Sequence, residues 1–362
     1  MSTRTRASLL VLAIALTVGV LPGSIAGQEP NTSQQRTLRS QTDLVSVYFA
    51  VRDDKKRLVT DLPQENFSVS EEGQPQTIKF FAHHSDVVLN VGLLLDTGTN
   101  MPWILGEEAE ASTMFLRHVV RPKDLGFLIS YASRVETVQL PTSDISLLKE
   151  KAASIGNGSA AIGLPEPPSA PESRIPSPGG GTTVGINGRA INDNREAHLY
   201  DAIRVSTHRY LEGEVGRKAI VVVALSGDAR SESTLQDALE VMLQNDVIAY
   251  VLQIYDGSKH DRCDVRHIFA KDAEGQPVLK KLTEATGGRM LEVRGIDKLE
   301  NALDEIADEL HHQYSLGYYP ENKNWDGKFR KIQISTNEKN FKVYARKGYY
   351  ANPPATNSAE SK

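Results

Sequence analysis

A run of apolar residues that ends in an aspartate constrains the fold of this chain more than any other stretch. Val87–Leu95 consists mostly of valine and leucine, and Asp96 ends the run. A strand buried on both faces of a parallel sheet has such a nearly continuous apolar pattern, whereas a strand with one solvated face alternates. The run therefore predicts a central strand of a parallel sheet.

A polar turn follows this strand, with the sequence Thr97-Gly98-Thr99-Asn100. Ligands of open parallel sheets bind at the carboxyl ends of the strands. Carboxylate, hydroxyl and amide oxygens are the ligands that hard cations prefer, so Asp96 and its neighbours are a candidate cation site. Asp96 can equally cap the following turn or helix by accepting backbone N–H groups, and both interpretations stay open.

Strand-like and helix-like segments then alternate up to about residue 312. Such alternation predicts a doubly wound, Rossmann-like α/β domain over residues 86–312. The segment 154–196 is rich in Gly, Pro and Ser and is expected to be a mobile insert. The expected strands are Leu125–Tyr131, Val135–Leu140, Ala219–Leu225, Val247–Ile254 and Met290–Val293, and the expected helices are Trp103–Val120, Ile145–Ala153, His198–Leu211, Leu235–Gln244, Val278–Ala285 and Ile296–His312.

Short β segments flank the α/β domain on both sides. In the N-terminal flank, residues 41–84, Phe67–Glu71 and Gln76–Phe81 surround a Glu72-Gly73 turn. The C-terminal flank, residues 313–350, alternates apolar and polar residues well. We expect the two flanks to complete each other as a small β-sandwich, with tyrosines packed inside it. A loose basic group is expected on turns and on the solvent face, and it consists of Lys323, Lys328, Arg330 and Lys331.

The N-terminus has the features of an export signal. Arg4 and Arg6 precede the apolar run Leu9–Leu21, and small residues follow at a plausible cleavage site. This pattern predicts a signal peptide over residues 1–26, and hence a periplasmic or extracellular protein. Residues 27–40 and 351–362 are expected to be a disordered linker and a disordered tail.

Composition narrows the classes of function. The net charge is −5, and it becomes −7 when the two arginines of residues 1–26 are removed, so no general basic surface for nucleic acid is expected. The chain has 1 cysteine, Cys263, which excludes an intrachain disulfide. We expect no membrane-spanning segment after signal cleavage.

The order and spacing of these segments resemble a von Willebrand factor type A domain, in particular the secreted bacterial subfamily with β flanks. The stretches that carry the resemblance are LVSVYFAVRDDKKRLVTDLPQENFSVSEEGQPQTIKFF, VGLLLDTGTNM, HLYDAI, IVVVALSGDARSES, LTEATGGRM, QYSLGYYP, DGKFRKIQI and ARKGYY. The resemblance implies an exported, non-enzymatic adhesion or protein-interaction module with an unidentified protein partner. It also implies a metal-ion-dependent adhesion site for Mg²⁺ or Mn²⁺ on the top face of the sheet.

Several positions depart from the ligand pattern of that family, so the resemblance implies a degenerate site. Asp96 matches the first ligand, while Gly98 and Ala197 stand where the family has a serine and a threonine. Asn100 offers an amide oxygen, and Asp228 is displaced by one residue from the usual third-loop aspartate. The implied partial metal site is therefore Asp96, Asn100 and Asp228, with Thr97, Thr99 and Ser226 as partner-binding residues. Asp228 can alternatively cap the Leu235 helix or the turn before it.

Two other functions compete with this interpretation. One is a structural envelope protein that binds through its β flanks without a metal. The other, less favoured, is a hydrolase that uses a loop with several ligand-type and nucleophilic residues, namely His260, Asp261, Cys263, Asp264 and His267. Cysteine and histidine can hold zinc, but the spacing matches no closed zinc motif, and we interpret this stretch as a solvated loop without catalytic residues.

Overall fold

The computed structural model describes residues 44–84, 87–98, 102–155, 183–184, 190–191, 197–224, 228, 230–255, 275–294 and 298–353. All of them belong to one compact unit, Thr42–Lys362. The predicted signal peptide and linker lie outside the described residues, as does the tail beyond Pro353. Within this description, no helix is long and apolar enough to cross a membrane.

A six-stranded sheet forms the centre of the α/β domain. Its order is β13 (Met290–Arg294), β12 (Val247–Tyr255), β11 (Arg217–Ala224), β6 (Leu89–Asp96), β7 (Leu125–Tyr131) and β8 (Val135–Thr142). All neighbouring pairs are parallel except β7 and β8, which form an antiparallel hairpin. Every residue of β6 is buried, as its nearly continuous apolar sequence predicts for a central strand.

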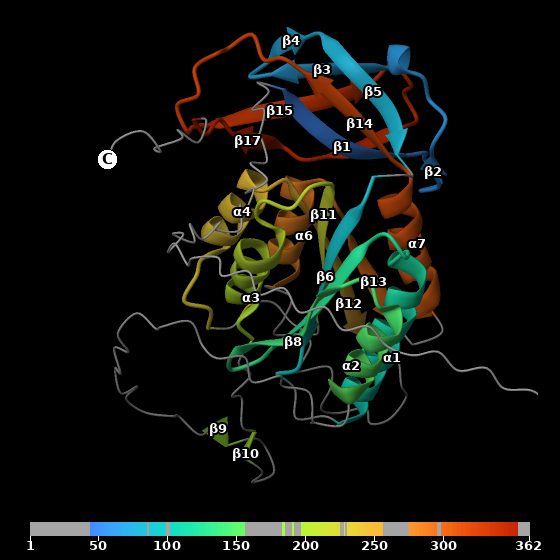
Figure 1. Ribbon diagram of the computed structural model, residues 1–362, viewed down its shortest axis with the longest axis vertical. Coiled ribbons are helices and arrows are strands. Elements are labelled where there is room, and N and C mark those ends of the chain that lie inside the picture. The colour runs from blue at the N-terminus through green and yellow to red at the C-terminus, as the bar shows by residue number, and fades with distance from the viewer. Residues whose placement is uncertain are drawn as a thin grey trace, which may run out of the picture. The chain divides into compact units, whose positions relative to one another are not determined.

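Helices cover both faces of this sheet (Figure 1). They are α1 (Pro102–Val119), α2 (Ile145–Ile155) and α7 (Leu299–His311) on one face, and α3 (Leu199–Ser206), α4 (Leu235–Gln244) and α6 (Gly275–Thr286) on the other. Two separate apolar clusters result, one on each face, because successive residues of each strand point to opposite sides. The doubly wound α/β class predicted from the sequence is confirmed.

The flanking segments form two further sheets that enclose a third apolar cluster. In one sheet the order is β16 (Lys342–Ala345), β1 (Val45–Arg52), β14 (Gln313–Tyr318) and β5 (Ile78–His84), and β2 (Leu58–Val59) also pairs with β1. In the other it is β17 (Gly348–Tyr350), β15 (Phe329–Thr336), β3 (Phe67–Glu71) and β4 (Gln74–Gln76). Strands from both ends of the chain therefore pair within each sheet of a β-sandwich, as the fold prediction requires.

The structure differs from the sequence prediction at two elements. The expected strand Gln76–Phe81 is divided, because β4 pairs with β3 across the Glu72-Gly73 turn while β5 joins the other sheet. The expected helix His198–Leu211 is α-helical only from Leu199 to Ser206 and continues as a π-helical turn, η2 (Thr207–Leu211). The remaining short elements are η1 (Gln64–Asn66) and the pair β9 (Thr183–Val184) and β10 (Ala190–Ile191), which lies within the predicted insert.

Candidate functional site

The carboxyl ends of the parallel strands form the edge at which the sequence places the candidate site. This edge lies at the end of the sheet away from the β-sandwich (Figure 1). Asp96 is the last residue of β6 and is 3% exposed. Its Oδ1 accepts a hydrogen bond from the Gly98 N–H at 3.1 Å. The Thr97 N–H donates to the Tyr131 carbonyl at 3.0 Å, which ties the turn to β7.

Asp228 follows the neighbouring strand β11 and caps helix α3. Its Oδ1 accepts the Tyr200 N–H at 3.1 Å and the Ser231 hydroxyl at 2.6 Å. Its Oδ2 accepts the Ser231 N–H at 3.3 Å, so the carboxylate also holds the turn that precedes α4. The sequence predicts a cap on that turn but not the cap on α3. Helix α4 itself has a capping box formed by Thr234 and Asp237.

Asp201 makes the reciprocal contact, from α3 back to the same turn. Its carboxylate accepts the Glu232 N–H at 2.9 Å, the Ser233 N–H at 3.0 Å and the Ser233 hydroxyl at 2.5 Å. Burial acts to raise the pKa of Asp201, but the hydrogen bonds from Ser233, Glu232 and His198 lower it overall. The carboxylate therefore stays ionised, which strengthens these bonds.

The Tyr200 phenol lies in the electrostatic field of Asp228. Burial and the negative charge of Asp228 raise the pKa of the Tyr200 phenol to about 12. The phenol is consequently neutral at physiological pH, and it contributes a hydroxyl rather than a charge.

The side chains that the structure describes at this edge do not by themselves supply the ligands of a divalent-metal centre. The two carboxylate oxygens of Asp228 accept three hydrogen bonds from protein groups, and Ala197 is buried and has no side-chain oxygen. In the described part of the chain, no group of three His, Cys, Asp or Glu side chains is arranged to hold a metal. Asn100, Thr99 and Ser226 lie outside the described residues, so their roles stay predictions.

The remaining sequence candidates give no second site among the described residues. The loop with His260, Asp261, Cys263, Asp264 and His267 lies outside them. Arg330, expected on the solvent face, is 3% exposed instead, and that expectation is wrong. It donates to Glu71 at 3.3 Å, and this pairing makes its burial inside the sandwich tolerable.

The fold defines a Rossmann-like α/β protein with a β-sandwich built from both flanks. No family model matches the chain, and no curated protein matches it. Solved structures with a weak overall similarity to the chain include von Willebrand factor type A domains.

Three of these structures illustrate the likeness. The von Willebrand factor type A protein from Catenulispora acidiphila is 9% identical, over 85% of this chain and 74% of that one, with a TM-score of 0.41. Proximal thread matrix protein 1 from the mussel byssus is 10% identical, over 63% of this chain, with a TM-score of 0.39. BatB from Bacteroides thetaiotaomicron is 14% identical, over 61% of this chain and 98% of that one, with a TM-score of 0.37. This chain spans about half, 49%, of the mussel protein.

Proposed function

We propose that the protein is an exported, non-enzymatic interaction module that binds a protein partner at the carboxyl edge of its central sheet. The observation that supports this most is the reciprocal fastening of α3 and the turn after β11. Asp228 binds the helix, and Asp201 binds the turn. These bonds hold the edge in one shape, which lowers the ordering cost that a partner would otherwise meet.

The proposed contact residues are those of the two loops at this edge. Thr97, Thr99 and Ser226 would contact the partner directly, beside Asp96 and Asp228. The resemblance to von Willebrand factor type A domains, drawn from the sequence, supports the same edge. The signal-peptide pattern of residues 1–26 supports a periplasmic or extracellular location.

We further propose that any metal site here is degenerate, with Asp96 and Asn100 as its main ligands. One structure of the mussel protein contains a zinc-occupied metal-ion-dependent adhesion site (MIDAS) motif. In this chain, Oδ1 of Asp228 already accepts hydrogen bonds from Tyr200 and Ser231, so Mg²⁺ or Mn²⁺ would approach through Oδ2, which accepts the Ser231 N–H. Titration calorimetry of wild type and Asp96→Ala with each metal tests the site, and equal heats in both proteins would exclude Asp96 as a ligand.

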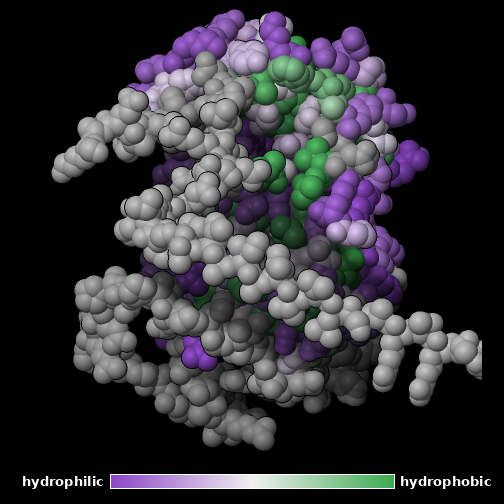
Figure 2. All heavy atoms as spheres, viewed as in Figure 1, coloured by the Kyte–Doolittle hydropathy of each residue, from purple (hydrophilic) through white to green (hydrophobic). Residues whose placement is uncertain are grey.

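A second candidate function, binding through the β flanks without a metal, has an observation of its own. Figure 2 shows hydrophobic residues gathered over the side of the sandwich that carries β5 and β14. Phe80 and Tyr319 are 55% and 42% exposed, and their ring centroids lie 6.4 Å apart. The Lys323 ammonium lies 5.8 Å from the centre of the Tyr319 ring. Exposed aromatic pairs of this kind are common anchors of protein interfaces.

One capture experiment separates the two surfaces. The purified chain would be immobilised as wild type, as Thr97→Arg and as Phe80→Ser, and exposed to envelope extract with and without EDTA. If the partner binds at the sheet edge, the protein that wild type captures is not captured by Thr97→Arg but is still captured by Phe80→Ser. Retention by Thr97→Arg and loss with Phe80→Ser would contradict the edge proposal and favour the flanks.

A further inference from the structure

A fully buried carboxylate lies where the β-sandwich meets the α/β domain. The side chain of Glu309, on α7, is 0% exposed. Its Oε2 accepts hydrogen bonds from Arg52 Nε at 2.9 Å and Nη2 at 2.7 Å, and from Arg289 Nε at 2.8 Å. Its Oε1 accepts the Tyr250 hydroxyl at 3.1 Å.

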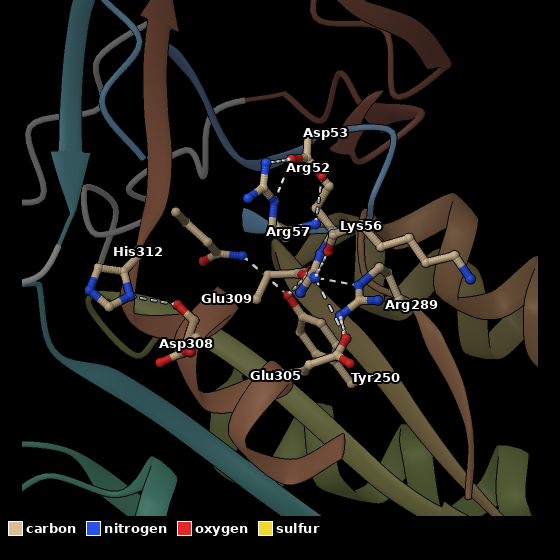
Figure 3. Close-up of polar contacts among 11 residues, drawn as sticks. Arg52, Asp53, Lys56, Arg57, Tyr250, Arg289, Glu305, Asp308, Glu309 and His312 are labelled. Atoms are coloured by element: carbon tan, nitrogen blue, oxygen red, sulfur yellow. Dashed lines mark hydrogen bonds and ion pairs between the residues drawn. The ribbon is translucent and has the colours of Figure 1, made fainter. Parts of the chain in front are cut away.

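The donors come from different parts of the molecule (Figure 3). Arg52 is the last residue of β1 in the sandwich, whereas Tyr250 belongs to β12 and Arg289 directly precedes β13 in the α/β domain. Glu305, one helical turn before Glu309, is 48% exposed and lies 3.5 Å from Arg52 and 3.2 Å from Arg289. Two guanidinium groups thus face two carboxylates, and the network is balanced in charge.

Burying these charges is a poor way to gain stability. The desolvation of a buried ion pair offsets much of its attraction, and apolar side chains of similar volume often stabilise a protein as well or better. Two N–H groups of the rigid, planar Arg52 guanidinium converge on one oxygen of Glu309, however, and this restricts the relative orientation of the two groups more than a single hydrogen bond would. The network is therefore better suited to setting an orientation than to adding stability.

Other contacts at the same junction restrict movement in the same way. Helix α7 ends at His311 and β14 begins at Gln313, so a single residue connects the two parts there. The Arg346 guanidinium, from the sandwich, pairs with Asp246 next to β12. The Lys347 N–H donates to the Ala285 carbonyl of α6 at 2.9 Å.

We propose that Glu309 fixes the orientation of the β-sandwich on the α/β domain, by binding Arg52 from one part and Arg289 and Tyr250 from the other, so that the two parts move as one rigid body. The sandwich then holds its surface at a constant distance from the carboxyl edge of the central sheet. A partner that contacts both surfaces meets a preformed arrangement.

Arg52→Met is the informative variant. It removes the bond from the sandwich but leaves Glu309 paired with Arg289 and Tyr250, so no buried charge is left without a partner. Arg57→Met is the matched control, because Arg57 also pairs with a carboxylate of the sandwich, Asp53, but is 73% exposed and bonds nothing in the α/β domain in the described structure.

Spin labels on exposed cysteines report the orientation. The labels would be placed at Ser68→Cys in the sandwich and Glu150→Cys on α2, in a Cys263→Ser background, and their distance distribution measured by pulsed electron resonance. We expect narrow distributions for the unmodified pair and for Arg57→Met. Arg52→Met should give a distribution about twofold broader, as a hinge motion becomes available.

A narrow distribution in folded Arg52→Met would overturn the proposal. If Arg52→Met does not fold, Arg52→Lys replaces it, since lysine keeps the charge but loses the rigid pair of N–H groups that bond Glu309. Broadening in Arg52→Lys then supports the proposal, and a narrow distribution in the folded Lys variant contradicts it.

Discussion

At the scale of single residues, Asp228 is the clearest example of a side chain whose position has two explanations. Its place after a buried strand suggests a metal ligand or a cap. In the structure both oxygens bind the N-terminus of α3 or the turn before α4. A carboxylate next to the first N–H groups of a helix satisfies them and interacts favourably with the helix dipole.

Replacing Asp228 tests the capping role. Asp228→Ala should lower the free energy of unfolding by about 1–2 kcal/mol, the usual effect of losing a helix cap. Asp228→Asn should lower it less, because the amide keeps one acceptor oxygen. Urea denaturation, in EDTA and in Mg²⁺, measures both. A loss that appears only in Mg²⁺ would show that the carboxylate acts through a metal instead.

The residues at the carboxyl edge of the central sheet also show what can and cannot be predicted from the sequence. Asp96 is identifiable from the sequence because it ends a nearly continuous apolar run, which is a local signal. The bond from Asp228 to Tyr200 spans 28 residues, and those from Asp201 to Glu232 and Ser233 span 31 and 32. No pattern along the chain marks such pairs, since they depend on how two loops meet in space. Glu309 could not be predicted either. It is one acidic residue among several on α7, and its partners come from distant parts of the chain.

At the scale of secondary-structure elements, β6 and β7 fit closely because one residue has no side chain. Gly92 pairs with Phe127 across the two parallel strands. A Cβ at position 92 would lie 2.3 Å from Cζ of the Phe127 ring, far inside van der Waals contact. The ring therefore occupies the space that any other residue at position 92 would need.

A double-mutant cycle tests this fit. Gly92→Ala should destabilise the protein by about 1–3 kcal/mol through overpacking. Phe127→Leu removes the ring atoms that clash, so the double variant should be more stable than the sum of the single effects predicts. Urea denaturation of the four proteins gives the coupling free energy. Strictly additive effects would mean that the ring moves aside at little cost.

A buried histidine, His311, lies where α7 meets the end of α1. His311 is 5% exposed, and its Nε2 lies 3.0 Å from the Val119 carbonyl at the end of α1. Burial lowers the pKa of His311 to about 4, assisted by Arg121 and Arg217 and opposed by the Val119 hydrogen bond and Asp124. The imidazole is thus neutral in the folded protein at pH values where it would be protonated in the unfolded chain.

The sign of the pH effect follows from this lowered pKa. The contribution of His311 to stability is fully present above the unfolded pKa of about 6.5 and is lost as the pH falls towards 4. Between pH 7 and 4.5, wild type should lose about 2 kcal/mol more than His311→Gln. Urea denaturation across this range measures the difference. The exposed neighbour provides the control, because His312→Gln should follow wild type, and parallel curves for wild type and His311→Gln would contradict the prediction.

At the scale of the whole molecule, both ends of the described chain are needed to build one sandwich. Strand β1 pairs with β14 and β16, and β3 pairs with β15. The central sheet was predictable because strands buried on both faces have a distinctive sequence. The division of Gln76–Phe81 between β4 and β5 was not, since short alternating strands specify a buried face but not which sheet they join.

Removing the C-terminal flank tests this dependence between the chain ends. A chain that ends at His312 lacks β15, which pairs with β3. It also lacks β14 and β16, which pair with β1. Its N-terminal flank cannot then bury its apolar face, because isolated short strands are not stable in water. Arg52, 4% exposed in the complete chain, should become accessible. We expect trypsin to cut after Arg52 in this truncated chain. A control chain that ends at Pro353 should not be cut there. Mass spectrometry of brief digests identifies the cut sites. Protection of Arg52 in the shorter chain would show that residues 44–84 fold without the C-terminal strands.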